Sequence, residues 1–561
     1  MSRPGHILTE RAAAAGANPA AATASETRSA AQWARRLALL LLAATAVFIV
    51  LTFDRHGISN DEEVQHVYGR LLVDFYASGL TDLRAFAYKN LYLYGGLFDL
   101  IAALIERSGV VGASVAGVWE MRHLLSAAFG LAGLAGTWLL ARRLAGEWAA
   151  LAALVLLLIT GAWSGAMFTH TKDVPFATAM VWSLYYIVRV APSLPHPARG
   201  DVIGLGVALG CAFGLRIGAV FALFYLGMTL LAAAAWRDGE SAGARAAAFG
   251  RSIVALLPAA LIAVALMGLF WPWAVMSPGN LWKAMTTFSH FSFLLHTILA
   301  GQVMPNGDAP GHYLLAYLLV RLPELFLLGL ALAALGALRA LPSLADPAGR
   351  RVALPWLPVV LAALFPIVYT LLAAPPLYNG IRHFTFLLPP LAVLAGAGLF
   401  AAWQRAVRWP RGRWAALAGC ALLVAGQVTM LARLHPYEYV AYNGFVGGLR
   451  GTTDRWEQDY WADSLRDAAA ELNAFVAREG HPDKTYTVAV CAESLQASVW
   501  LDPKLVVTRD WWIADFFLSP THMDCDTAVK GRIIGKVERE GVVLAVIKDR
   551  RMLVGEERRP R

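Results

Sequence analysis

The chain has 561 residues, of which 58% are hydrophobic and only 16% are charged, and its mean hydropathy is +0.53. Soluble globular proteins are about half apolar and about a quarter charged, so this composition excludes an ordinary soluble protein and indicates several membrane-spanning helices. The net charge of +9 is compatible with nucleic-acid binding. However, the arginines cluster between apolar runs, as they do in the cytoplasmic loops of membrane proteins. We therefore expect membrane lipid, and no nucleic acid, as a partner.

The N-terminal region joins a polar tail to the first apolar run. Residues 1–32 are rich in Ala, Ser and Thr and lack apolar periodicity, so we expect a disordered cytoplasmic tail. The apolar run 37–53 follows without a small-residue cleavage site, which predicts a retained membrane-spanning helix and not a signal peptide.

Eleven apolar runs are candidate spans, most of them near the roughly 20 residues that a hydrocarbon core of about 30 Å requires. The stretch 202–236 is divided at Arg216, because an unpaired arginine at the bilayer centre costs at least roughly 3 kcal/mol. The run 91–106 is shorter and is expected to lie in the interface. The eleven runs are 37–53, 118–140, 144–162, 174–190, 202–215, 218–236, 253–273, 313–338, 354–373, 384–402 and 414–431.

The arginines between these runs predict the orientation. With the division at Arg216, nearly every arginine pair falls on one side, which the positive-inside rule assigns to the cytoplasm. Eleven crossings then place the N-terminus inside and the C-terminus outside. We predict a polytopic α-helical protein of a bacterial inner membrane, with a transmembrane catalytic domain over residues 33–432.

Residues 433–561 are more polar and predict a small α/β domain on the periplasmic side. A helical pattern covers 463–477, and short strands are expected at 485–490, 504–508, 514–518, 533–538 and 542–548. Cys491 and Cys525 could form a disulfide there. The tryptophans of this region are either a sugar-binding surface or a core, and they are Trp456, Trp461, Trp500, Trp511 and Trp512.

Acidic residues follow the first span directly. Asp61 and Glu62 are either solvated loop residues or a catalytic pair at the membrane surface, in which one carboxylate takes the proton of an acceptor hydroxyl. Asp173 is either the N-cap of the span 174–190 or a second carboxylate facing Asp61. Glu62 and His66 are four residues apart, as two ligands of a divalent cation on one helix face would be. Two ligands do not define a metal site, so no cofactor is assigned.

Basic residues are also expected on the outer face. Lys89, Arg216 and the pair Arg382 and His383 are either interfacial side chains that reach toward water or contacts for a lipid-linked phosphate. His170 and Lys172, beside Asp173, are further site candidates. The sequence contains no nucleotide-binding or metalloprotease motif, which argues against an ATP-driven pump.

Together these motifs resemble those of the GT-C membrane glycosyltransferases, in the branch (glycosyltransferase family 39-like) with protein O-mannosyltransferases, the lipid A aminoarabinose transferase and rhizobial lipopolysaccharide glycosyltransferases. The resemblance covers about residues 36–432. Asp61-Glu62 resembles the acidic motif of the family's first outer loop, and Lys89 resembles its phosphate-contacting lysine. The remaining matches are His170-Thr171-Lys172-Asp173-Val174-Pro175, the run Gly301, Pro310, Tyr313 and Pro323, and Arg382-His383-Phe384 with Pro389-Pro390.

The resemblance implies an inverting transfer of a hexose or pentose from a polyprenyl-phosphate donor to an extracytoplasmic acceptor, which is an envelope glycan, lipid or protein. Asp61 would be the base, and Lys89 and Arg382, with Arg216, would contact the phosphate.

Two other functions remain open. A lipid or glycan transporter (a flippase) would carry ionisable residues deep in several spans and often inverted repeats, and neither is clear here. A catalytically inactive scaffold would use its outer domain to bind envelope glycans.

Overall fold

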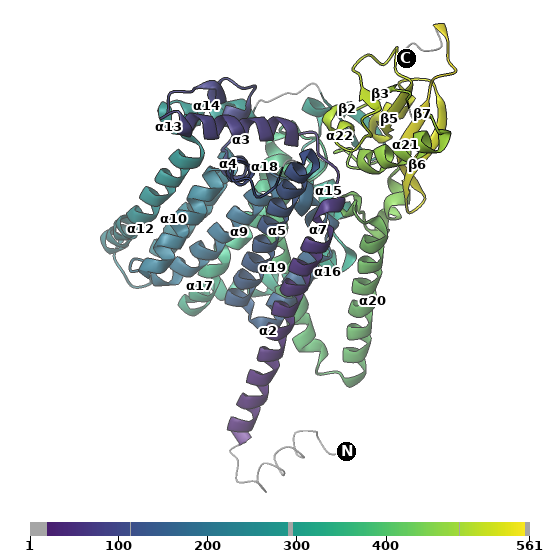
Figure 1. Cartoon of the computed structure of the whole chain (residues 1–561). Coiled ribbons are helices and arrows are strands. Elements are labelled where there is room, and N and C mark those ends of the chain that lie inside the picture. Colours follow the sequence, from purple (N-terminus) through teal and green to yellow (C-terminus); the bar gives the residue numbers. More distant parts are fainter. Residues whose placement is uncertain (1–18, 113, 290–294, 482, 556–561) are drawn as a thin grey trace.

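The computed structural model describes residues 19–112, 114–289, 295–481 and 483–555. Among these residues, nine helices are long and apolar enough to cross a membrane, or ten if one bent pair counts as a single span. They form one bundle, with a small sheet domain at one end (Figure 1). The predicted class, a polytopic helical membrane protein with a small C-terminal α/β domain, is confirmed.

The long helices follow the predicted runs. The predicted span 202–215 corresponds to α10, whose 15 residues reach only about 22 Å at about 1.5 Å per residue, and which packs between α9 and α12. The helices are α2 (Pro19–Thr52), α5 (Val115–Ala145), α6 (Glu147–Leu158), α9 (Asp173–Val190), α10 (Arg199–Phe213), α11 (Val220–Ala235), α12 (Ala242–Phe270), α16 (Glu324–Ala340), α17 (Pro347–Ala353), α18 (Leu357–Ala373), α19 (Leu388–Ala406) and α20 (Pro410–Leu434).

Burial distinguishes central helices from peripheral ones. In the most apolar windows of the α9 and α19 spans, 78% and 72% of the residues are buried, against 17% for α2 and 11% for α20. The apolar side chains that α2 and α20 expose therefore suit contact with lipid, while α9 and α19 form the centre of the bundle.

Three predicted boundaries are corrected. Residues 19–32, expected to be disordered, are helical as the first part of α2, consistent with the high helix propensity of alanine. The predicted single span 313–338 is broken at Pro323, between α15 (Tyr313–Arg321) and α16, because proline cannot continue a helix without losing a hydrogen bond. The predicted span 144–162, which directly follows α5, is bent by 73° after α6, before α7 (Gly161–Ser164) and α8 (Ala166–Thr169).

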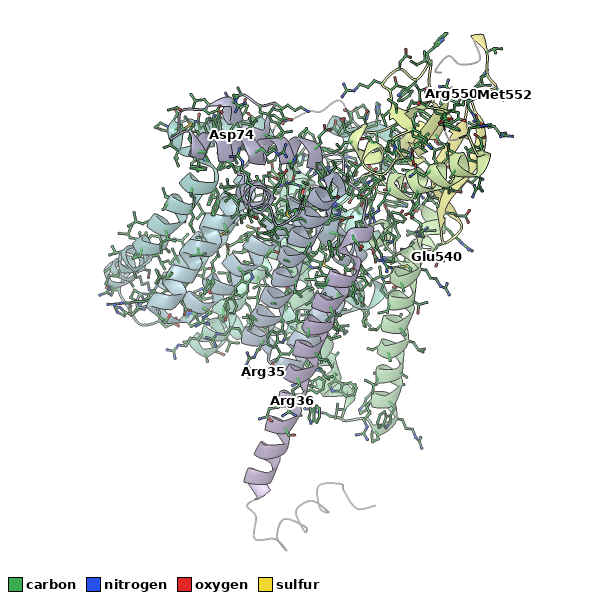
Figure 2. All side chains as sticks on the ribbon, in the orientation of Figure 1. Arg35, Arg36, Asp74, Glu540, Arg550 and Met552 are labelled. Atoms are coloured by element: carbon green, nitrogen blue, oxygen red, sulfur yellow. A yellow bond between two sulfur atoms is a disulfide. The ribbon has the colours of Figure 1, made fainter. Side chains whose placement is uncertain are left out.

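Short elements cover the end of the bundle that carries the sheet domain (Figure 1). The predicted interfacial run 91–106 is divided into a 3₁₀ turn and α4. At this end lie α3 (Glu62–Ala77), α4 (Leu97–Arg107), α13 (Pro272–Met276), α14 (Asn280–Ser289) and the antiparallel hairpin of β1 (His296–Leu299) and β2 (Gln302–Pro305). Asp74 on α3 marks this end in Figure 2, and Arg35 and Arg36 mark the opposite one.

The C-terminal domain is a five-stranded mixed sheet in the order β4-β3-β5-β7-β6. β3 pairs in parallel with β4 and β5, while β7 runs antiparallel to β5 and β6. α21 (Leu465–Glu479) packs on the sheet, and a disulfide joins Cys491 to Cys525. The strands are β3 (Tyr486–Val490), β4 (Leu505–Val507), β5 (Phe516–Pro520), β6 (Arg532–Arg539) and β7 (Val542–Asp549), each within two residues of the predicted bounds.

The segment between α20 and this sheet packs on the helical bundle. Its 3₁₀ turn Glu438–Val440 contacts α7, where a Cβ atom added to Gly161 would lie 2.2 Å from the Glu438 carbonyl oxygen. Trp456 and Trp461, in the same segment, are buried. Residues 435–464 therefore link the two parts of the molecule.

Candidate active site

The loop after α2 directs Asp61 and Glu62 to different surroundings. The Ser59 backbone N–H donates to Glu62 Oε2 (2.8 Å), and the Ser59 hydroxyl donates to the Thr169 carbonyl (3.1 Å). These bonds fix the loop before α3, whose first residue is Glu62. Glu62 is fully buried and lies 3.4 Å from His123 Nε2, whereas the Asp61 side chain is 40% exposed.

Asp173 and two arginines form a buried charge cluster with Asp61. Arg382 Nη2 lies 2.5 Å from Asp61 Oδ2, and Arg382 Nε lies 3.2 Å from Asp173 Oδ2. The other Asp173 oxygen lies 2.5 Å from Arg216 Nη2. Asp173 is the first residue of α9 rather than its N-cap, and a carboxylate in the first turn is favoured by the helix dipole. The structure thus brings together four of the predicted site residues, Asp61, Asp173, Arg216 and Arg382.

Aromatic rings surround these cations. The Arg382 guanidinium lies 3.9 Å from the centre of the Trp461 ring, and Lys172 Nζ lies 4.2 Å from that of Tyr94. Arg216 lies 6.0 Å from the Tyr94 ring. Cations over ring faces are attracted by the ring quadrupole and remain charged with less water around them. The cluster is therefore a partly dry, positively charged site.

The two basic side chains before Asp173 are buried and have shifted pKa values. Burial lowers the pKa of Lys172 to about 8, against the opposing effect of the Asp99 and Asp61 carboxylates. Burial also lowers the pKa of His170 to about 3, so this ring is neutral at physiological pH. His170 Nε2 lies 2.8 Å from the Tyr460 hydroxyl and accepts a hydrogen bond from Trp461 Nε1 (3.0 Å). His170 therefore positions Trp461 beneath Arg382.

Lys89 does not join the cluster. It is exposed, with its Nζ 5.9 Å from the Tyr88 ring centre, and it forms no ion pair with a described residue. The pKa of Tyr88 is raised by burial and by the negative charge of Glu63, which places this turn near the start of α3. His383 is half-buried, with its ring edge-on to Tyr378 at 4.7 Å.

Glu62 and His66 are not brought together as metal ligands. His66 Nδ1 faces Glu106 Oε2 at 3.6 Å, and burial with the positive charge of Arg122 lowers its pKa to about 4. Across the described ranges, no group of three or more His, Cys, Asp or Glu side chains is arranged to hold a metal ion. These residues do not fit a divalent cation.

Several contacts were not anticipated from the sequence. Tyr94 and Tyr378 lie in loops without a distinctive motif. Trp461 is far in the sequence from its partners Arg382 and His170, and the separation from His170 is 291 positions. A second buried pair, Asp99 with Arg122 (3.2 Å), joins α4 to α5, and burial raises the pKa of Asp99. Of these contacts, only that of Trp461 was indicated by the sequence, through the aromatic content of residues 456–461.

The fold and this cluster define a polytopic membrane protein with a cationic site at one end of its helical bundle. Residues 112–273 match the model of the family described as dolichyl-phosphate-mannose-protein mannosyltransferase. The match includes α5 to α12, with Asp173 and Arg216, and it confirms the predicted resemblance to the GT-C membrane glycosyltransferases. No curated protein sequence matches the chain significantly.

Several solved structures are similar to the chain, and three of them follow. ArnT from Cupriavidus metallidurans, bound to undecaprenyl phosphate, is 14% identical, with 91% of this chain and 97% of that chain covered and a TM-score of 0.45. The oligosaccharyltransferase AglB from Archaeoglobus fulgidus is 12% identical, with 87% and 69% covered and a TM-score of 0.46. The arabinofuranosyltransferase AftD from Mycobacteria is 14% identical, with 91% and 40% covered and a TM-score of 0.39.

Proposed function

We propose that the chain is an inverting glycosyltransferase that moves a hexose or pentose from a polyprenyl-phosphate donor to an extracytoplasmic acceptor in the cell envelope. The observation that carries the proposal is the pair of arginines, Arg216 and Arg382, held by Asp173 beside the partly exposed carboxylate of Asp61. Two cations suit a phosphate leaving group, and the accessible carboxylate suits a general base.

The arginines would bind the donor phosphate. Guanidinium groups match the geometry of phosphate oxygens and stay charged when buried. In a site with little water, such fixed cations stabilise the charge that develops on the departing phosphate. Lys172 adds a third positive charge below its pKa of about 8. Lys89 remains a proposed contact at the exposed turn, outside the cluster.

Asp61 would act as the base once the donor is bound. The phosphate competes with Asp61 for Arg382, which frees the carboxylate to take the proton of the acceptor hydroxyl. The acceptor oxygen forms a bond to C1 of the sugar while the bond from C1 to the phosphate oxygen breaks. The lipid phosphate leaves with the electron pair, and a single displacement inverts the configuration at C1. Asp173 would orient both arginines, and Glu62 would hold the loop that carries Asp61.

An apolar groove offers a place for the polyprenyl tail. It lies between α10, α11 and α12, has a volume of about 380 Å³, and is lined by apolar side chains, among them Leu209, Phe213, Leu226, Leu256 and Met267. Phe213 ends α10, three residues before Arg216. A lipid in this groove would therefore have its phosphate near the arginines.

The alternative functions have less support. In a transporter we would expect charges in the middle of several spans, but Asp173 and Arg382 are the first residues of their spans. An inactive scaffold would not need Arg216 and Arg382 to pair with the same carboxylate, that of Asp173.

The sugar and the acceptor can be identified together in cells. Envelope glycans of a deletion strain and its parent are compared by mass spectrometry, and we expect the deletion strain to lack one sugar. The molecule that lacks it is the acceptor for an assay with purified protein and polyprenyl-phosphate donor. Identical glycans in both strains would contradict the proposal.

In that assay, Asp61→Asn is expected to lower kcat by at least about 100-fold, as for removal of a general base. The matched control is Asp74→Asn, because Asp74 lies on α3 and, among the residues that the structure describes, its ion pairs are with the exposed Arg84 and Arg107. We expect this control to transfer sugar normally. Near-wild-type kcat in Asp61→Asn would remove Asp61 as the base.

A further inference from the structure

The C-terminal domain contains a pocket that the proposed transfer does not use. Its volume is about 380 Å³, and it lies where the parallel strands β3 and β4 end. Sheets with parallel strands commonly bind ligands at these carboxyl ends. The side chains that line it include Cys491, Glu493, Ser494, Thr508, Arg509 and Trp511.

The chemistry of the pocket suits a sugar. Glu493 and Arg509 are exposed, and neither forms an ion pair with any residue that the structure describes, so both are available to hydroxyl groups. Ser494 and Thr508 add two hydroxyls. Trp511 supplies an aromatic surface of the kind that packs on apolar faces while its polar edge stays wet.

The walls of the pocket are firmly held. The centre of the Trp511 ring lies 5.2 Å from that of the buried Phe517, and the Arg550 guanidinium donates a hydrogen bond to the backbone carbonyl of Trp511. The opposite wall begins at Cys491, which the disulfide ties to Cys525 with their Cα atoms 6.3 Å apart. A pre-formed pocket loses less conformational entropy when it binds a ligand.

One side chain connects this pocket to the candidate active site. The Glu493 backbone N–H donates to Gln496 Oε1 (3.2 Å), and the buried Gln496 amide donates to the carbonyls of Ile58 (2.5 Å) and Trp461 (2.7 Å). Ile58 precedes Asp61 by three residues, and Trp461 underlies Arg382. In Figure 1, α22 (Leu495–Ser498) lies on the side of the domain that faces the helical bundle.

We propose that this pocket binds a sugar unit of the acceptor other than the unit that receives the transferred sugar. The inference rests on the proposed glycosyl transfer and narrows its acceptor to a glycan, rather than a peptide or a simple lipid. Gln496 on α22 bonds to the pocket loop and to the loop that carries Asp61. A glycan bound at Trp511 would therefore extend along α22 toward the Asp61 carboxylate.

The test measures binding directly, with the full-length protein in detergent. The probe is the water-soluble glycan fraction released by mild acid from envelopes of a strain that lacks this protein, since that fraction carries unmodified acceptor. Saturation-transfer NMR gives the affinity. We expect Trp511→Ala and Arg509→Gln each to raise the apparent Kd about tenfold, equivalent to about 1.4 kcal/mol.

The matched control is Trp512→Ala, because Trp512 is the neighbouring exposed tryptophan and does not line the pocket. It is expected to bind the fraction like the wild type. Arg509→Gln changes only an exposed side chain, so it tests the pocket even if Trp511→Ala fails to fold. The proposed glycan site would be wrong if the wild-type protein does not bind the glycan fraction. It would also be wrong if Arg509→Gln, and Trp511→Ala where that variant folds, both bind with wild-type affinity.

Asp61→Asn separates the two proposals. It is expected to bind the glycan fraction normally and to lower kcat by at least about 100-fold. If Asp61→Asn transfers sugar normally, Asp61 is not the base, and the glycan site is then judged from the binding data alone. If the pocket variants keep full affinity while Asp61→Asn is inactive, the glycan site is wrong and the transfer stands.

Discussion

Arg382 meets partners from three distant parts of the chain. Its guanidinium contacts Asp61 after the first span, Asp173 at the start of α9 and the Trp461 ring in the segment before the sheet domain. Its side chain is only 7% exposed, and a buried cation is tolerated only when it is paired and hydrogen-bonded. The sequence already indicated a functional role for Arg382, because a lone arginine on the predicted outer face departs from the usual distribution of positive charge.

Lys172 gives the site a pH dependence. Burial lowers its pKa from 10.5 to about 8, so it is a cation below this pH and neutral above it. If it helps to bind the donor phosphate, the KM for the donor should rise as the pH increases through about 8. Steady-state kinetics of the purified protein across this pH would measure the rise.

Two variants check that Lys172 is the titrating group. Lys172→Arg keeps its charge at every accessible pH and should remove the increase in KM. Lys172→Met should show a high KM already at neutral pH, with no further rise. A wild-type KM that does not change through pH 8 would show that the lysine charge plays no part in donor binding.

At the scale of elements, the loop before α4 packs directly on the turn between α10 and α11. The Gly95 N–H donates to the Leu215 carbonyl (3.2 Å), and the Leu97 N–H donates to the Gly214 carbonyl (2.9 Å). These bonds hold Tyr94 beside Arg216, which follows in the same turn. A Cβ atom on Gly95 would lie 2.1 Å from the Gly214 carbonyl carbon, so only glycine allows this approach.

Gly95→Ala is therefore expected to separate the two loops. Overpacking of this kind costs about 1–3 kcal/mol, and the displaced Tyr94 and Arg216 should raise the KM for the donor. Thermal unfolding in detergent and the transfer assay measure the two effects. The control is Gly227→Ala within α11, where a Cβ meets no neighbour and alanine should stabilise the helix by roughly 0.5–1 kcal/mol. Equal stability of the two variants would show that the loops are not in contact.

The elements themselves were largely predictable, because apolar runs and alternation are local properties of the sequence. The turn at Arg216 followed from the cost of a charge in the bilayer, and all five strands of the sheet domain were anticipated. The break at Pro323 was missed because the apolar pattern continues across it. The contacts within the site were harder to predict from the sequence. Lys89 and Arg216 were equally good candidates for binding the phosphate. The structure places Arg216 beside Asp173 and Lys89 at an exposed turn.

At the scale of the whole molecule, two independent features indicate which end faces the cytoplasm. Arg35 and Arg36 mark one end of the bundle (Figure 2). Helix α5 begins after α4, which lies at the opposite end, and it finishes with Arg142 and Arg143 in its last turn. Arginine-rich ends of this kind are typically cytoplasmic. The opposite end carries the sheet domain with its disulfide, and disulfides persist in oxidising compartments such as the periplasm. From both features we predict that the charged cluster lies on the outer side.

Labelling of single cysteines tests this orientation. Met552 is 89% exposed in the sheet domain, and Arg36 is exposed near the start of the first span, at the other end of the molecule (Figure 2). With Cys211 and Cys420 replaced by alanine, an impermeant maleimide applied to intact spheroplasts should label Met552→Cys and leave Arg36→Cys unlabelled until the membrane is opened. The reverse pattern would place the charged cluster in the cytoplasm, where the disulfide would be reduced and a soluble nucleotide sugar would be the more accessible donor.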